Sequence, residues 1–363
     1  MEAHLGRGDH GHERSDLEKR PGDVDNSGDS KRPREGDHDY GGAMEMDEEG
    51  DEHDGPPNPF ARNSMYRKEW AVMHGHQGDF EDETKRGPMK NTYGPVLPTR
   101  ATPRNTMEVF YIKVARITAD LHWPLDVYGD VAVRDSLDHM RNYLFRRPRE
   151  NCQTLTSPED SLLELTGPSR AIVMIDDPCV EIDLKVKGPG SPSEDKALSC
   201  KVFGYGNIGY RGNTSYAMTE VVSSGSSTVE VRFAHLRLSL EATITVRLVS
   251  GPGNFRLARF TASTASIGED VVLLDSGDRE LPVGEDGLVT LRRRVVVVED
   301  QGNLTLEFKA TQQQVDDDAE GGGGGTEVMR WVNFPARSAL RTEKPFGLGS
   351  SIFQAEVAWS LLP

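Results

Sequence analysis

Two aromatic residues and three arginines lie close together in the run YLFRRPR, which covers positions 143–149. Guanidinium groups form charge-assisted hydrogen bonds with phosphates and carboxylates, and aromatic rings stack on bases or on arginine. This combination predicts a binding surface, with RNA or an anionic surface as the ligand that such groups would hold. We call it the Tyr143–Arg149 cluster, and its members are Tyr143, Phe145, Arg146, Arg147 and Arg149.

A second basic run, Arg292–Arg294, interrupts an alternating apolar segment. In a strand, Arg293 would point to the face opposite its two neighbours, which is awkward for a core. An edge strand protected by charge explains this arrangement. Edge protection or salt pairing also accounts for such clusters better than nucleic-acid binding does, because the chain has no broad basic face.

Four aspartates fall at expected strand ends, where calcium could find several oxygen ligands. They are Asp135, Asp138, Asp176 and Asp177. Their loops lack the dense aspartate spacing that supplies two or three ligands each. Polar turns are therefore the preferred interpretation, and no metal site is predicted.

The remaining motifs predict neither a cofactor nor a catalytic site. Residues 204–209 match G-x-G-x-x-G, but the turn-forming run that follows has no helical periodicity that would place N–H groups on a pyrophosphate. The chain contains neither G-x-S-x-G nor H-E-x-x-H. Its three cysteines have no C-x-x-C spacing, so we expect reduced thiols.

Basic residues near the N-terminus follow the pattern of a bipartite nuclear import signal, with a pair, a ten-residue spacer and a second cluster. They are Lys19, Arg20, Lys31, Arg32 and Arg34. An import receptor reads such a signal in an extended, solvated segment, so the pattern predicts import. The competing interpretation is that a charged tail produces this spacing by chance.

The acidity of the chain is concentrated at its start. Of a formal net charge of −17, the first 58 residues carry −11, with 18 acidic and 7 basic side chains. Residues 1–57 have too few apolar side chains to offset the entropy of ordering, so we predict a disordered acidic tail. The sequence shows no signal peptide and no apolar run near the ~20 residues of a membrane span. We therefore expect a protein of the cytoplasm or nucleus that is not secreted.

One short helix is predicted within residues 58–104. Asn58 and Pro59 fit an N-cap and the first helical position. Tyr66, Trp70 and Met73 then repeat at helical spacing. We expect the aromatic face of this helix to pack on the β region, in preference to docking a partner. The prolines and glycines that follow it indicate an extended connector.

Residues 105–363 are dominated by the alternation of apolar and polar side chains that strands require. The run 180–187 alternates without a fault and places Glu181 on its polar face. Near the start of this region, Phe110, Ile112 and Val114 share one face. Strands with one polar face are typical of antiparallel sheets and exclude a buried parallel sheet.

Two irregularities modify this pattern. The parity of the apolar positions changes between Phe233 and Leu236, which indicates a bulge or turn around Ala234 and His235. Residues 315–326 are rich in glycine and aspartate and predict a flexible insertion within the domain. The fold class is therefore all-β: an antiparallel β-sandwich or a partly open barrel over 105–363, with one short N-terminal helix and a disordered tail.

Several long runs are distinctive, namely TMEVFYIKVARI (106–117), LHWPLDVYGDVAVRDSLDHMRNYLFRR (121–147), RFAHLRLSLEATITVRLV (232–249) and FTASTASIGEDVVLLDS (260–276). They resemble the plant family known as domain of unknown function 6598, which is expanded in grasses. The resemblance extends from about residue 60 to the end. It implies no established activity. Some members carry names that link them to jasmonate-induced or ribosome-inactivating proteins, and in some the domain accompanies an rRNA N-glycosidase domain.

The link to N-glycosidases has a residue-level test. Depurination in that class needs a helix-borne Glu-x-x-Arg beside stacking aromatic side chains. The nearby match is Glu327 and Arg330, followed by Trp331, just after a run of glycines. No long helix is expected there, so the chain is predicted to hold the accessory domain without depurinating activity.

These observations predict a non-enzymatic β-sandwich module that acts through contacts with an unknown protein partner, in plant stress or defence. Two alternatives stay open. One is an accessory domain or remnant of a ribosome-inactivating N-glycosidase, and the other is binding of RNA or an anionic surface through the arginine clusters. A nucleic-acid partner is less favoured than a protein, and the sequence does not set the oligomeric state.

Overall fold

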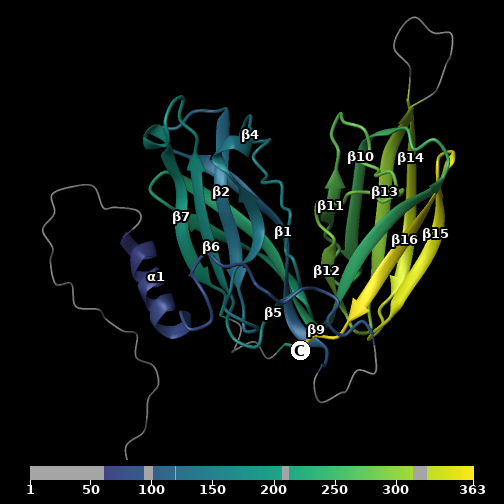
Figure 1. Ribbon diagram of the computed structural model, residues 1–363, viewed down its shortest axis with the longest axis horizontal. Helices are drawn as coiled ribbons and strands as arrows, with labels where there is room; N and C mark the ends of the chain where they lie inside the picture. Colours follow the sequence, from purple (N-terminus) through teal and green to yellow (C-terminus); the bar gives the residue numbers. More distant parts are fainter. Residues whose placement is uncertain (1–60, 94–100, 119, 207–211, 314–324) are drawn as a thin grey trace, which may run out of the picture. The chain divides into compact units, whose positions relative to one another are not determined.

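The computed structural model describes residues 61–93, 101–118, 120–206, 212–313 and 325–363. These residues form one α-helix, two short 3-10 helices and sixteen strands in three sheets (Figure 1). All paired strands are antiparallel. The predicted fold class, antiparallel β-sandwich with one short N-terminal helix, is confirmed. The predicted acidic tail and its import signal lie outside the described residues, as does most of the predicted insertion.

The first sandwich has a five-stranded sheet as one of its layers. Its order is β3-β2-β6-β7, with β4 beside β2. The strands are β2 (Leu125–Arg134), β3 (Asn142–Arg147), β4 (Gln153–Leu155), β6 (Cys179–Val186) and β7 (Lys196–Gly204). The opposite layer is part of a seven-stranded sheet, namely β1 (Arg104–Ile117), β5 (Ile172–Val173), β8 (Tyr216–Ser223) and the first half of β9 (Ser227–Ser250). The 3-10 helices Arg149–Asn151 and Pro192–Glu194 lie in connections of this sandwich.

The second sandwich uses the rest of the seven-stranded sheet. This part consists of the second half of β9 with β12 (Val295–Glu299), β15 (Arg341–Leu348) and β16 (Ser351–Ser360). It faces a four-stranded sheet of order β11-β10-β13-β14. Those strands are β10 (Phe255–Thr264), β11 (Val271–Asp275), β13 (Asn303–Gln313) and β14 (Gly325–Pro335). In Figure 1 the strands of the two sandwiches form two groups.

Strand β9 belongs to both sandwiches and explains the change of parity in its sequence. Phe233 packs in the first core and Leu236 in the second, because successive side chains of a strand point to opposite faces. A bulge is present, but its left-handed residue is Leu238, with φ of 44°. The predicted turn around Ala234 and His235 is therefore wrong, and the strand continues through these residues. The alternation of the sequence alone does not distinguish one sandwich from two.

Strand β1 shows the same behaviour at Phe110. The register of β1 against β9 changes between Val109 and Tyr111, and Phe110 is therefore the extra residue of a bulge. Ile112 packs in the first core, whereas Phe110 turns to the second. The prediction that Phe110 shares a face with Ile112 is therefore wrong. The bulge brings an aromatic ring of the first sandwich against the second one.

Helix α1 (Ala61–His74) is the predicted helix, and its predicted cap lies outside the described residues. Trp70 is buried against Phe80 and donates its indole N–H to the carbonyl of His139 at 3.1 Å. Tyr66 donates its hydroxyl to Glu181 on β6 at 3.0 Å, so the aromatic face packs on the β region as expected. Met73, expected on the same face, is 60% exposed. No helix in the described part of the chain is long and apolar enough to cross a membrane.

Candidate ligand-binding cavity

The Tyr143–Arg149 cluster does not present its aromatic rings to solvent. Phe145 is completely buried in the first core, and Tyr143 is nearly so. The face of β3 that carries Tyr143 is covered by the segment after helix α1, where the tyrosine hydroxyl bonds the carbonyl of Glu81 at 2.9 Å. The prediction that these rings belong to a stacking surface is therefore wrong. Its physical reason is that both faces of β3 are covered.

The three arginines of the cluster all lie beside carboxylates. Arg146 stacks over the ring of Tyr143 and lies 3.8 Å from both Asp130 and Glu83. Arg149 donates two bonds to Asp195, at 2.8 and 3.0 Å. These bonds hold the pKa of that aspartate well below its usual range. Each guanidinium therefore already has a counter-charge within the molecule.

The third arginine connects the two basic clusters. Arg147 pairs with Glu164, and the same carboxylate oxygen lies 2.9 Å from Nη1 of Arg292. Glu164 thus brings together residues that the sequence separates by more than a hundred positions. Nothing in the sequence marks Glu164 as their shared partner. The pairing lies at the rim of a cavity.

This cavity has a volume of about 400 Å³. One wall comes from the first sandwich, through β1 and residues 153–165, and the other from the second, through β11, the turn after it and residues 292–293. Its buried apolar lining consists of Phe110, Leu163, Leu165, Leu273 and Leu274. Leu162 is 49% exposed beside this lining, so the cavity opens to solvent. Among the described residues, the cavity combines apolar surface with charged groups of both signs at its edge.

The charged groups at the edge of the cavity are held mainly by contacts within β10, β11 and the turn after β11. Arg259 on β10 pairs with Asp275 at the end of β11 at 2.8 Å, and Asp275 also accepts the N–H of Gly277. The tight turn that follows is possible because Gly277 adopts a left-handed φ of 50°. Arg279 then projects from this turn, with its Nε 3.4 Å from the carbonyl of Ser276. Two cationic side chains therefore lie at the opening, Arg259 from β10 and Arg279 from the turn after β11.

Arg293 lines the same cavity from the interior. It is 2% exposed, and it donates to Glu108 on β1 at 3.1 Å. Its Nε is buried and has no hydrogen-bond partner in the described part of the molecule. Residues 292–294 precede β12 and do not form a strand, so the predicted charged edge strand is wrong. The central arginine instead neutralises a carboxylate between the two sandwiches.

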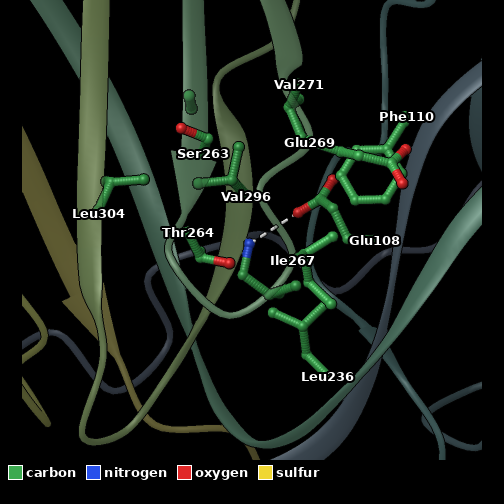
Figure 2. Close-up of a pocket in the computed structure, with 12 residues that line it drawn as sticks. Glu108, Phe110, Leu236, Ser263, Thr264, Ile267, Glu269, Val271, Val296 and Leu304 are labelled. Carbon is green, nitrogen blue, oxygen red and sulfur yellow. Dashed lines mark hydrogen bonds between the residues drawn. The ribbon is translucent and has the colours of Figure 1, made fainter. Parts of the chain in front are cut away.

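Glu108 is the other half of this buried pair. Its second oxygen accepts the backbone N–H of Val297 at 2.8 Å, and Figure 2 shows this bond beside a much smaller cavity. That cavity, about 10 Å³, holds at most about one water molecule. Burial raises the pKa of Glu108 to about 7, against the opposing effect of Arg293. Burial likewise lowers the pKa of Arg293. Both shifts favour neutral forms because desolvation penalises charge.

The predicted polar turn is present at Asp135 and Asp138, with an addition that the sequence does not indicate, whereas Asp176 lies in a bend and Asp177 in the connection before β6. Asp135 accepts the N–H of Leu137, as a polar turn residue does. However, Asp135 is also buried and receives two bonds from Arg170, at 2.6 and 2.9 Å, while Asp138 receives a third at 3.2 Å. In the described ranges, no three His, Cys, Asp or Glu side chains are grouped as metal ligands would be.

Comparisons with known proteins give a family and little else. No curated protein matches the chain. Among solved structures, human group IVD cytosolic phospholipase A2 matches at 12% identity and a TM-score of 0.22, over 73% of this chain and 33% of that one. The same enzyme in complex with methyl gamma-linolenyl fluorophosphonate gives 12% identity and a TM-score of 0.21, over 72% and 33% of the two chains. This chain thus spans about a third of the length of those structures, and scores this low carry no argument about its fold or activity.

The family comparison is of a different quality. The model of one family matches residues 106–357, which include every strand of both sandwiches at least in part, and the walls of the cavity. On this match, the chain belongs to the family described as "Domain of unknown function (DUF6598)".

Proposed function

We propose that this chain is a non-enzymatic binding module and that the cavity between Phe110 and Arg279 is its binding site. The observation that carries this proposal is a solvent-accessible cavity of about 400 Å³ with a buried apolar lining. Ligand sites of proteins have volumes of roughly 300–1,000 Å³ and combine apolar walls with a few polar groups. A protein partner and a role in plant stress or defence, both expected from the sequence, complete the proposal.

The apolar lining supplies a reason for binding. Leu162 is half exposed at the edge, and the side chain of Val272 faces the same space from β11. Covering apolar surface stabilises a complex by about 25 cal/mol per Å². An apolar group of a partner would gain this free energy on entering the cavity.

The arginine clusters are weaker candidates for a binding site. Arg146, Arg147 and Arg149 each have a carboxylate within 4 Å. A phosphate that approached them would have to displace this carboxylate or share the cation with it. Surface ion pairs contribute only about 0–1 kcal/mol, so displacement is feasible, but nothing in the geometry rewards it. Binding of RNA or an anionic surface there is therefore the less supported proposal.

The N-glycosidase alternative also receives little support from geometry. Glu327, Arg330 and Trp331 lie on β14, not on a helix. Residues three apart on a strand point to opposite faces, so Glu327 and Arg330 would not converge on one substrate. Glu327 pairs instead with Lys309 on the neighbouring strand at 3.2 Å.

Binding of an uncharged fluorescent probe, phenylnaphthylamine, tests the proposal directly. The full chain is expected to bind it at one site, with the rise in fluorescence that accompanies burial in an apolar cavity. Leu162→Trp and Val272→Trp fill the cavity from opposite walls and should abolish this signal. Val221→Trp is the matched control, because Val221 is 56% exposed on β8, outside the cavity. Unchanged binding by both filled variants, or no binding by the parent chain, would contradict the proposal.

A further inference from the structure

The cations around the cavity are not equally satisfied. Arg292 pairs with Glu164 and Arg259 with Asp275, at 2.9 and 2.8 Å. Arg293 has one carboxylate contact and an Nε without a partner in the described part of the chain. A buried donor that makes no hydrogen bond costs about 1–3 kcal/mol, and native structures contain few of them. Because this Nε has almost no accessible surface, a ligand in the cavity would reach Arg293 at its terminal Nη atoms, of which only Nη2 donates to a carboxylate among the described residues.

Arg279 provides a second donor group at the opening. It is exposed, and its described hydrogen bond is the long one to the carbonyl of Ser276. No ion pair of Arg279 with a carboxylate is found among the described residues, unlike Arg259 and Arg292. The cavity thus has one incompletely bonded arginine inside and a second one at its edge.

The acidic groups of the cavity do not cancel these two cations. Glu164 is shared between Arg147 and Arg292, and Asp275 is bonded by Arg259 and by the N–H of Gly277. Asp160 accepts from Thr156 at 2.7 Å. Asp278 lies on the exposed turn, where water screens its charge. Glu164 and Asp275 are therefore already paired with arginines, whereas Asp160 and Asp278 have no arginine partner among the described residues.

We infer that the group that enters the cavity is an organic anion, with an apolar body against the leucine and phenylalanine lining and a carboxylate or sulfonate head between Arg293 and Arg279. This inference rests on the proposed function and specifies the chemistry of the ligand. A guanidinium suits such a head group because its planar set of N–H donors matches two oxygens at once. The apolar body of the ligand would pack against the buried lining and cover Leu162, which is half exposed at the solvent opening.

Paired probes separate the contribution of charge from that of apolar burial. Anilinonaphthalene sulfonate and phenylnaphthylamine share the same aromatic body, and only the first carries an anionic head. We expect the full chain to bind the sulfonate roughly tenfold or more tightly than the neutral probe at one site, as one charge-assisted hydrogen bond implies. Leu162→Trp should abolish binding of both probes, which places them in the cavity.

Arginine variants then test the head-group contacts. Arg279 is exposed, so Arg279→Gln should fold normally. We expect this variant to bind the sulfonate severalfold more weakly and the neutral probe with unchanged affinity. Arg293→Met should remove the remaining preference, but it disturbs a buried pair, so Arg279→Gln is the decisive variant. Arg256→Gln is the matched control, because Arg256 lies outside the cavity on β10 and is 48% exposed.

The two proposals fail in different ways. If both probes bind equally and Arg279→Gln has no effect, the anion inference is overturned while the binding site stands. If neither probe binds, or Leu162→Trp has no effect on either, the binding site itself is overturned.

The same head-group chemistry could come from a free acid or from the C-terminal carboxylate of a protein. Displacement of the bound sulfonate by decanoate, but not by decanol, would assign a free acid. Displacement only by a peptide that ends in a free leucine carboxylate, and not by its amide, would assign a protein terminus. Failure of both competitors would contradict the inferred chemistry.

Discussion

Two of the buried carboxylates that have arginine partners, Glu181 and Glu108, differ in how completely they are bonded. Glu181 on β6 accepts from Arg134, from Arg141 at 2.7 Å and from the hydroxyl of Tyr66 at 3.0 Å. Arg134 also donates to the carbonyls of Phe80 and His139, at 2.6 and 2.7 Å. Glu108, by contrast, has a single arginine, and the Nε of Arg293 is unpaired.

The difference corresponds to what each cluster does. Around Glu181 the hydrogen bonds connect to helix α1 and to Phe80, so these contacts fix the segment from helix α1 to Phe80 on the first sandwich. Around Glu108 they join the two sandwiches, and the buried Nε of Arg293 has no hydrogen-bond partner among the described residues. A fully bonded buried network rigidifies a structure, whereas a buried donor without a partner costs free energy. We therefore regard the network around Glu181 as structural and the Glu108–Arg293 pair as part of the proposed binding site.

Glu181→Gln should have the largest effect on stability. It removes the charge that compensates two buried arginines, and breaking a buried pair in this way costs about 3–5 kcal/mol. Chemical denaturation of the full chain measures this loss. Glu327→Gln is the matched control, because Glu327 forms an exposed pair with Lys309 and should cost no more than about 1 kcal/mol.

Equal losses in these two variants would refute the structural role of Glu181. Hydrogen exchange sharpens the same test, since Glu181→Gln should increase exchange most strongly in the segment from helix α1 to Phe80. A uniform increase over the chain would instead indicate global destabilisation without a specific loss of that segment.

The pH dependence of Glu108 should be the next largest effect. Its pKa is about 7 in the folded chain against an ordinary 4.5, so between these values the folded state holds a proton that the unfolded state has released. The stabilisation from this group is complete below about pH 4.5 and is lost as the pH rises through about 7. The total change is on the order of 3 kcal/mol.

Denaturation across this range, for the wild type and for Glu108→Gln, isolates the effect. The difference in unfolding free energy between them should fall as the pH rises, because glutamine does not titrate. Other charged groups near Glu108 are Arg293 and Glu269, and Glu269 pairs with Arg232. They are present in both proteins, so their contributions largely cancel. A difference that is constant with pH would contradict the raised pKa.

The sequence predicts the class of this fold because alternation is a local signal. It does not predict which polar positions are covered by distant segments. Glu181 lies on the polar face of a regular alternating strand, yet it is buried because helix α1 and Phe80 cover that face. Phe110 follows the alternation of β1 in the sequence, but a bulge turns it to the other core.

The sequence does not predict the position of the candidate site. Its walls come from β1, the segment 153–165, the turn after β11 and the residues before β12, and no motif links these segments. The sequence predicts a binding surface at the Tyr143–Arg149 cluster and a charged edge strand or salt pairing at Arg292–Arg294. Only the fold shows that Arg147 and Arg292 share Glu164 and that Arg293 is buried.

Replacing both members of the Glu108–Arg293 pair should have the smallest effect. In Glu108→Gln/Arg293→Met the glutamine carbonyl can still accept the N–H of Val297, and the buried positive charge with its unpaired Nε is gone. Exchanging a buried ion pair for groups of similar volume is often neutral or stabilising. We therefore expect the unfolding free energy at pH 7 to stay within about 1 kcal/mol of the wild type. A loss as large as that of Glu181→Gln would mean that both clusters are structural, and the Glu108–Arg293 pair would then no longer count as part of the proposed binding site.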